Sequence, residues 1–189
     1  MNNILKKSIK EYQENQDLLY RIQKLSNEIR TSSKEAIALL RRENIKESKK
    51  TIKNIENRFK LINKVVKQDK DLLNQSFYKE AVEEYIEAIT FYNFLTKSNK
   101  GVPKFVEVKP EEIIAGVCDF TGELLRRAIT VASVDNFKQI GGYKKVIENI
   151  AEQLTKIGFK GKLRQKYDEA ERNLSKIEDI IYDIKLKKN

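Results

Sequence analysis

The first hundred residues carry apolar side chains at the spacing of α-helices, with polar and charged residues between them. All seven glycines and both prolines lie at or after Gly101, so the first half lacks the residues that usually interrupt helices. This half is therefore predicted to be helical. Its clearest apolar stripes are Leu18, Ile22, Leu25 and Ile29, and Ile52, Ile55, Phe59 and Ile62.

Within this half, Ser32 and Glu35 form a capping-box pattern with two open interpretations. Ser32 either starts a new helix or lies inside one long helix. Lys70 and Asp71 form a weak break. Residues 97–110 contain glycine and two prolines, which predicts a loop even though FVEV alternates with a period of two.

The second half is predicted to contain further helices. Pro110 suits a first helical turn, and the acidic residues after it favour a helix that reaches about Val131. Gly141 and Gly142 are expected to mark or interrupt another boundary. Gly161 precedes a last helix with a heptad-like stripe that needs a partner helix. This stripe consists of Leu163, Tyr167, Ala170, Leu174, Ile177, Ile181 and Ile184.

The length of 189 residues suits one domain over residues 1–189. The net charge is +10, which favours polyanions such as nucleic acid. The first 70 residues hold 18 basic and 9 acidic residues, a net charge of +9. Residues 71–130 hold 7 and 10, a net charge of −3, so an acidic middle follows a basic start.

The absence of histidine excludes a Ser-His-Asp triad and imidazole metal ligands. A single cysteine, Cys118, excludes an internal disulfide and a CxxC zinc site, and fits a reducing compartment. No stretch has about 18 uninterrupted apolar residues, and the N-terminus does not resemble a secretory signal. We therefore expect a soluble, cytoplasmic protein with no membrane partner.

Two predicted helices each carry a pair of acidic residues on one face. Glu84 and Glu87 are three residues apart, and Asp119 and Glu123 are four apart. Asp119 and Glu123 interrupt a largely apolar run, where a buried carboxylate needs a cation or hydrogen bonds. Periodicity alone leaves two options open: ordinary ion pairs, for example with Arg126, or a metal site. Four carboxylates without sulfur or imidazole would suit Mg²⁺ or Mn²⁺.

A basic region over residues 41–64 has two interpretations. It is either a solvated helix face, or a subset of it binds phosphates. The KGKLRQK stretch, residues 160–166, is a second basic candidate. The candidate nucleic-acid-binding residues are Arg41, Arg42, Lys49, Lys50, Lys53, Arg58, Lys162 and Arg164. Aromatic residues at 77–78 and 91–94 could stack on bases, although core packing is the simpler interpretation.

Four segments resemble the translin family, in matching order and approximate spacing. They are KLSNEIRTSSKEAIALLRR (24–42), EEYIEAITFYNF (83–94), GVCDFTGELLRRAI (116–129) and LRQKYDEAERNLSKIEDIIYDIK (163–185). The likeness is greater to the catalytic branch, translin-associated factor X, than to translin itself. The resemblance implies an all-α fold of about seven helices and a ring-like or shell-like assembly of up to eight subunits, with nucleic acid inside.

The resemblance also implies a Mg²⁺-dependent endoribonuclease, whose E-x-x-E and D-x-x-x-E acids fall on Glu84, Glu87, Asp119 and Glu123. Translin proper lacks this full acid set. Eukaryotic members pair two different chains, but this chain holds both a basic region and an acid set, so we expect a homo-oligomer. The expected function is cleavage of single-stranded or partly structured RNA. The alternatives are a non-catalytic oligomer that binds RNA or single-stranded DNA, and a structural protein that docks partners through its C-terminal stripe.

Overall fold

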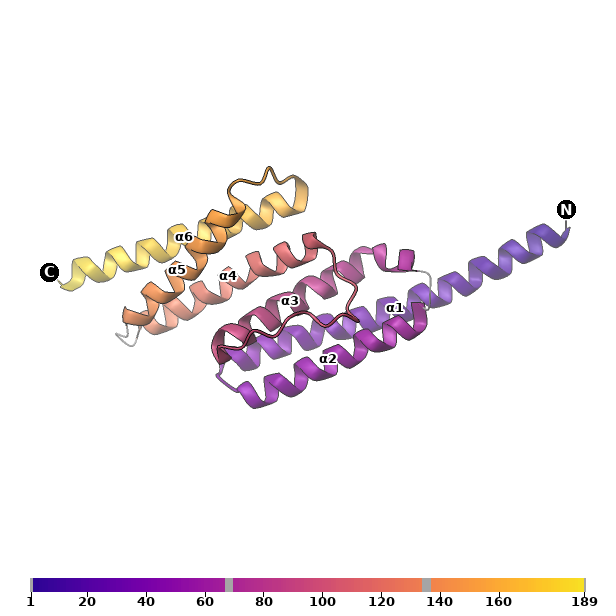
Figure 1. The fold of residues 1–189 in the computed structure, drawn as a ribbon, viewed down its shortest axis with the longest axis horizontal. Helices are drawn as coiled ribbons and strands as arrows, with labels where there is room; N and C mark the ends of the chain where they lie inside the picture. Colours follow the sequence, from indigo (N-terminus) through magenta and orange to yellow (C-terminus); the bar gives the residue numbers. More distant parts are fainter. Residues whose placement is uncertain (1, 67–69, 134–136, 189) are drawn as a thin grey trace. The chain divides into compact units, whose positions relative to one another are not determined.

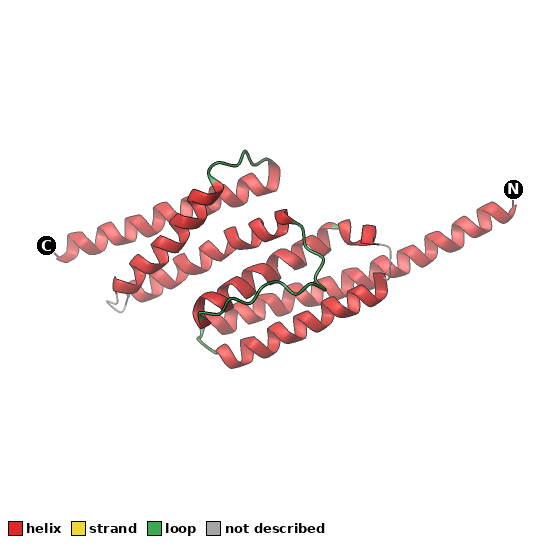
Figure 2. Cartoon of the chain, viewed as in Figure 1, coloured by secondary structure: helices red, strands yellow, loops and turns green. Residues whose placement is uncertain are grey.

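The computed structural model describes residues 2–66, 70–133 and 137–188. Within these ranges the chain is built from helices and contains no strand (Figure 2). The predicted all-α fold is confirmed. The helices, labelled in Figure 1, are α1 (Asn2–Arg41), α2 (Ile45–Val66), the 3₁₀ helix η1 (Lys70–Asn74), α3 (Ser76–Thr96), α4 (Pro110–Ala132), α5 (Phe137–Leu154) and α6 (Gly161–Lys188).

The helices form two compact units, Met1–Val108 and Lys109–Asn189. Unit 1 contains α1, η1, α2 and α3, and unit 2 contains α4, α5 and α6. The single domain over residues 1–189 stays a prediction. No helix in the described ranges combines the length and apolar character needed to span a lipid bilayer.

In unit 1, α1 packs against both α2 and α3 (Figure 1). The predicted stripes supply its core, where Ile22, Ile29 and Ile55 are fully buried. Each such side chain contributes about 1.5–3 kcal/mol through removal from water. The ring of Phe59 meets that of Tyr85 edge-on, with centroids 5.3 Å apart. Of the aromatic residues considered for base stacking, Tyr78 and Phe91 are buried, so these two serve the core.

The N-terminal 40 residues of unit 1 settle the question raised by Ser32. The helix α1 runs without interruption from Asn2 to Arg41, so Ser32 lies inside one long helix. The preceding hydroxyl, of Thr31, donates to the carbonyl of Asn27 at 3.0 Å, a bond that is compatible with a continuous helix.

The segment between α3 and α4 is a loop, as predicted, and is fastened to unit 1. Lys97 ends α3 in the left-handed conformation (φ 53°). Asn63 of α2 donates its side-chain amide to the carbonyl of Phe105 at 2.5 Å, and Tyr78 of α3 donates its hydroxyl to the carbonyl of Glu107 at 2.8 Å. FVEV forms no strand, and two carbonyls that a strand would offer to a sheet partner instead accept hydrogen bonds from the side chains of Asn63 and Tyr78.

The helix α4 begins at Pro110 and ends close to the predicted residue. Its first turn is stabilised by Glu112, whose carboxylate accepts a hydrogen bond from the backbone N–H of Lys109 at 2.5 Å. In unit 2, α4 packs against α5 and α6, and α5 packs against α6.

The prediction of a boundary at Gly141 and Gly142 is wrong, because α5 continues through both residues. Buried Ile140, Tyr143 and Ile147 anchor α5 on both sides of the glycines, and this packing outweighs their low helix propensity. Gly161 does begin the last helix, in the left-handed conformation (φ 56°). The stripe on α6 finds its partners inside unit 2, with Tyr167, Ala170 and Ile177 among its buried members.

Candidate functional site

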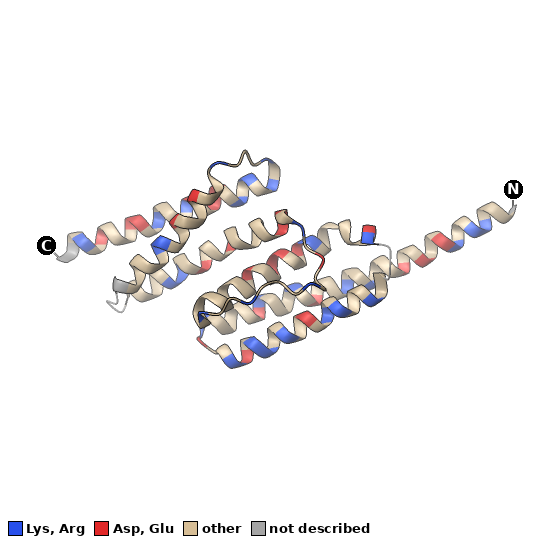
Figure 3. Cartoon of the chain, in the orientation of Figure 1, with Lys and Arg blue, Asp and Glu red and all other residues tan. Residues whose placement is uncertain are grey.

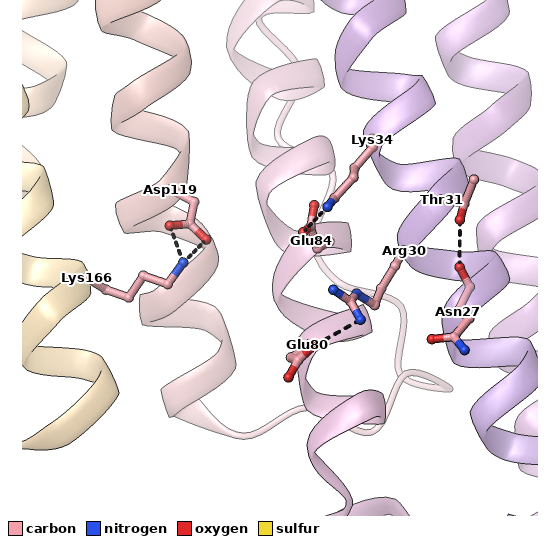
Figure 4. Close-up of polar contacts among 8 residues, drawn as sticks. All are labelled: Asn27, Arg30, Thr31, Lys34, Glu80, Glu84, Asp119 and Lys166. Carbon is pink, nitrogen blue, oxygen red and sulfur yellow. Dashed lines mark hydrogen bonds and ion pairs between the residues drawn. The ribbon is translucent and has the colours of Figure 1, made fainter.

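The acidic face of α3 is lined by cations from α1. Glu84 Oε1 lies 3.4 Å from Nζ of Lys34, and Glu80 Oε2 lies 3.1 Å from Nη1 of Arg30 (Figure 4). Both helices advance by four residues between the two pairs, so α1 and α3 run in the same direction here. Glu87 is half-buried about one turn after Glu84 on α3. The Glu84 carboxylate is 23% exposed, which leaves it accessible from solvent.

On α4, Asp119 is held by a lysine from α6. Lys166 Nζ donates to both carboxylate oxygens of Asp119, each at 2.6 Å (Figure 4). The two side chains are 23% and 24% exposed, so the pair lies at the edge of the packed interior. Hydrogen bonds between charged groups at such distances are shorter and stronger than neutral ones. The cation thus occupies the side of the carboxylate that a metal ion would approach.

Glu123 lies one turn further along α4 and is more deeply buried. Its side chain is 6% exposed, and Oε1 lies 3.8 Å from Nε of Arg126, which is a loose ion pair rather than a hydrogen bond. The predicted partner Arg126 is therefore present at the predicted spacing. A buried carboxylate of this kind favours binding of a nearby cation, since its charge is expensive to leave uncompensated.

The neighbouring Cys118 does not add a metal ligand. Burial, reinforced by the negative charge of Asp119, raises the pKa of its thiol to about 11. The raised pKa makes the thiolate harder to form, and Mg²⁺ and Mn²⁺ prefer oxygen ligands to sulfur. The remaining donors are carboxylate oxygens, and these suit a hard cation such as Mg²⁺ or Mn²⁺.

The candidate ligands come from both units, two from each. Glu84 and Glu87 share the acidic face of α3, and Asp119 and Glu123 share a face of α4. Within either unit, the described residues contain no group of three or more acidic or cysteine side chains close enough to hold a metal ion. A single metal site formed by all four acids stays a prediction.

Seven of the eight predicted nucleic-acid-binding residues lie on α1, α2 and α6, and Arg42 follows α1 directly. Figure 3 shows lysine and arginine positions along these helices. Arg58 is half-buried and its Nε donates to Oε2 of Glu28 at 3.0 Å. It lines an open groove of about 620 Å³ on unit 1, together with polar residues of α1. The other seven are exposed: Arg41 at the end of α1, Arg42 just after it, Lys49, Lys50 and Lys53 on α2, and Lys162 and Arg164 on α6.

Two of these exposed residues have acidic neighbours on their own helix. Lys50 Nζ lies 2.8 Å from Oε1 of Glu47, and Arg164 Nε lies 2.7 Å from Oδ1 of Asp168. Local pairing of this kind is typical of a solvated helix face and competes with phosphate binding. Lys49 and Lys53 are the stronger candidates for phosphate contact on α2, because they share one exposed side of the helix.

Three functional candidates are added by the structure. Arg30 and Lys34 were absent from the predicted basic set, and Lys166 was predicted only as part of a phosphate-binding stretch. Arg30 and Lys34 are four residues apart, as are Glu80 and Glu84, and this equal spacing is the sequence signal that could have indicated the two ion pairs. It identifies matching charges, but the two segments are 50 residues apart and only packing places their helices side by side.

These features define a helical protein in which lysines and arginines pair with partly buried acidic residues of two helices. The chain belongs to the translin family, whose model matches residues 17–188. It is 28% identical to the translin-associated protein X homolog of Schizosaccharomyces pombe, over 90% of this chain and 82% of that protein. The family predicted from the sequence is confirmed.

Solved structures share the fold. The crystal structure of AfC3PO has a TM-score of 0.85 at 23% identity and covers 96% of this chain and 97% of its own. An AfC3PO–duplex RNA complex has a TM-score of 0.83 at 22% identity and covers 96% of each chain. Apo-NeC3PO has a TM-score of 0.82 at 23% identity and covers 94% of this chain and 95% of its own.

Proposed function

We propose that this chain is a nucleic-acid-binding, homo-oligomeric endoribonuclease that depends on Mg²⁺. The observation that carries the proposal is the carboxylate of Asp119, which is partly exposed, lies between apolar residues of α4 and holds a cation across both oxygens. Membership of the translin family supports nucleic-acid binding, and the AfC3PO–duplex RNA complex supports RNA as the ligand class.

In this proposal Glu84, Glu87, Asp119 and Glu123 are the metal ligands, directly or through water. When bound, Mg²⁺ would polarise the scissile phosphate and increase the acidity of a water molecule. One of the four carboxylates accepts the proton of the attacking water. The eight candidate basic residues bind the RNA backbone through its phosphates. Seven of them lie on α1, α2 and α6, and Arg42 follows α1. Binding is therefore salt-sensitive and mostly independent of sequence.

Assembly into a homo-oligomer of up to eight copies is part of the proposal. The structural neighbours are C3PO proteins, and one chain here carries both the acid set and the basic residues. Light scattering of the purified chain measures the assembly mass directly. A monomeric mass at micromolar concentration would contradict this part of the proposal.

Cleavage of a labelled RNA, with Mg²⁺ and then with excess chelator, tests the catalytic part. The full chain should cut with Mg²⁺ and stop cutting when the chelator is added. Asp119→Asn should abolish cleavage and leave RNA binding intact or stronger. Asp179→Asn is the matched control, because it removes one acid from the exposed surface of α6, outside the proposed site. Equal rates in wild type and Asp119→Asn would reject the assignment.

A second candidate function is a non-catalytic oligomer that binds RNA or single-stranded DNA. It is favoured by the ion pairs of Glu84 with Lys34, Asp119 with Lys166 and Glu123 with Arg126, which provide these acids with cations from the protein itself. In that case RNA is retained at low salt, but no Mg²⁺-dependent product appears. The same cleavage assay therefore separates the two candidates.

A further inference from the structure

Two of the four proposed metal ligands are in contact with a lysine ammonium. Lys166 Nζ is 2.6 Å from both oxygens of Asp119, and Lys34 Nζ is 3.4 Å from Oε1 of Glu84. The lysines come from different helices than the acids, so these contacts are not a consequence of helical spacing. Lys34 is 61% exposed and Lys166 is 24% exposed. Both ammonium groups therefore have access to solvent.

An ammonium group and a divalent cation compete for the same carboxylate oxygens. Lys166 is bidentate on Asp119, so a metal ion that binds this carboxylate must displace the lysine or share the oxygens with it. The displaced ammonium is then repelled by the metal charge and needs another anionic acceptor. A lysine head group sits on a flexible four-carbon stem, and a phosphate oxygen of bound RNA is an acceptor within the reach of such a stem.

We infer that Lys166 and Lys34 are exchange cations, each of which holds one proposed metal ligand in the metal-free chain and transfers to an RNA phosphate when a divalent cation binds. This inference rests on the proposed function for its metal and its RNA. Its consequence is reciprocal coupling: the divalent cation increases the affinity for RNA, and RNA increases the affinity for the cation. In the reaction both lysines are positioning residues that stabilise the phosphate charge.

The competition for Asp119 is tested by Mn²⁺ binding, followed through the electron paramagnetic resonance signal of free Mn²⁺. Lys166→Met removes the charge and keeps most of the apolar stem, and it should tighten Mn²⁺ binding roughly twofold to fivefold, the range expected for a partly exposed ion pair. Lys144→Met is the matched control, since Lys144 is 27% exposed and pairs with Glu148 and Glu178. An unchanged Mn²⁺ affinity in Lys166→Met, or no Mn²⁺ binding by wild type, would overturn the inference.

The same competition at Glu84 is tested independently in unit 1. Lys34→Met should also tighten Mn²⁺ binding, by a smaller factor because the pair is longer and more exposed. Lys70→Met is its control, since Lys70 is 67% exposed and its Nζ lies 2.8 Å from Oε2 of Glu107. This second variant keeps the inference testable if Lys166→Met fails to fold, which circular dichroism reveals.

Transfer of Lys166 to phosphate is tested by a double-mutant cycle in chelator, where no cleavage occurs. Asp119→Asn releases the lysine and should increase affinity for a fluorescent RNA about threefold. The same substitution in the Lys166→Met background should give a clearly smaller increase. Equal increases in both backgrounds would show that only the lost negative charge matters and would overturn the transfer step.

These measurements do not depend on catalysis. If wild type binds Mn²⁺ and the Mn²⁺ and RNA results follow the expected pattern, but Mg²⁺ produces no cleavage, the exchange role stands and the nuclease proposal fails. If wild type cleaves RNA and Lys166→Met binds Mn²⁺ as wild type does, the nuclease proposal stands and the exchange role fails.

Discussion

The side-chain amide of Asn173 on α6 donates a hydrogen bond of 2.9 Å to Oγ1 of Thr121 on α4, and both residues are buried. The hydroxyl of Thr121 in turn donates to the carbonyl of Cys118 at 2.6 Å. This chain of hydrogen bonds joins α4 to α6 two residues from Asp119. It therefore helps to hold the helix that carries two of the proposed metal ligands.

Thr121→Val should lower the free energy of unfolding by about 1–3 kcal/mol, because it leaves the buried amide of Asn173 without this acceptor. Urea denaturation followed by circular dichroism measures the change. Thr130→Val is the control, since the Thr130 hydroxyl is exposed on the same helix and bonds only to its own backbone turn. Equal losses in the two variants would contradict a role for the link between α4 and α6.

Gly122→Ala should increase the free energy of unfolding by about 0.5–1 kcal/mol through helix propensity. A Cβ at Gly122 would lie 3.7 Å from Nδ2 of Asn173, an ordinary contact that requires no movement. Gly142→Ala in α5, where nothing lies within 4 Å, serves as a reference for the propensity gain. A lower melting temperature for Gly122→Ala alone would mean that the approach of α6 is tighter than the structure indicates.

The thiol of Cys118 should react slowly with a disulfide reagent at pH 8 in the folded protein. Burial raises its pKa from 9.0 to about 11, so the thiolate fraction falls about 100-fold before access is considered. The rate of this thiol reaction, measured by absorbance in buffer and in denaturant, tests the prediction.

The sign of the associated pH dependence follows from the same raised pKa. As the pH rises, the thiol ionises at a lower pH in the unfolded chain than in the folded protein. Its contribution to the free energy of unfolding is therefore complete below pH 9 and is lost as the pH rises through about 11. Cys118→Ala should lack this contribution. Rapid modification of the native thiol would contradict its burial.

Lys49→Gln combined with Lys53→Gln should weaken RNA binding and reduce the slope of log affinity against log salt by about 1.4–1.8, if each lysine contacts one phosphate. Fluorescence anisotropy at several salt concentrations gives the slope. Lys7→Gln combined with Lys10→Gln removes the same charge from the exposed start of α1, where each lysine pairs with a glutamate. An equal reduction in both variants would assign the effect to net charge rather than to α2.

Local signals were enough to predict much of the fold. The stripes containing Ile22 and Ile55, the loop at residues 97–110, the start of α4 at Pro110 and the start of α6 near Gly161 are all confirmed. These features depend on residues a few positions apart. The spacing of apolar residues, the ring of proline and the missing side chain of glycine act on the local backbone directly. The same reasoning failed at Gly141 and Gly142, since packing of α5 against its neighbours compensates for weak helix propensity.

Asp119 and Glu123 were visible in the sequence, because a carboxylate inside an apolar run is unusual. Glu84 and Glu87 were indicated by their shared helix face and by the family resemblance. Their cationic partners were not. Lys166 lies 47 residues from Asp119, and Lys34 lies 50 residues from Glu84. Which of 38 basic residues meets a given acid depends on which helices pack together and in which direction they run. The sequence by itself thus determined the helices, the breaks between them and the chemically unusual residues. Packing between distant helices decided the ion pairs, because two side chains far apart in the sequence come into contact only when their helices lie side by side.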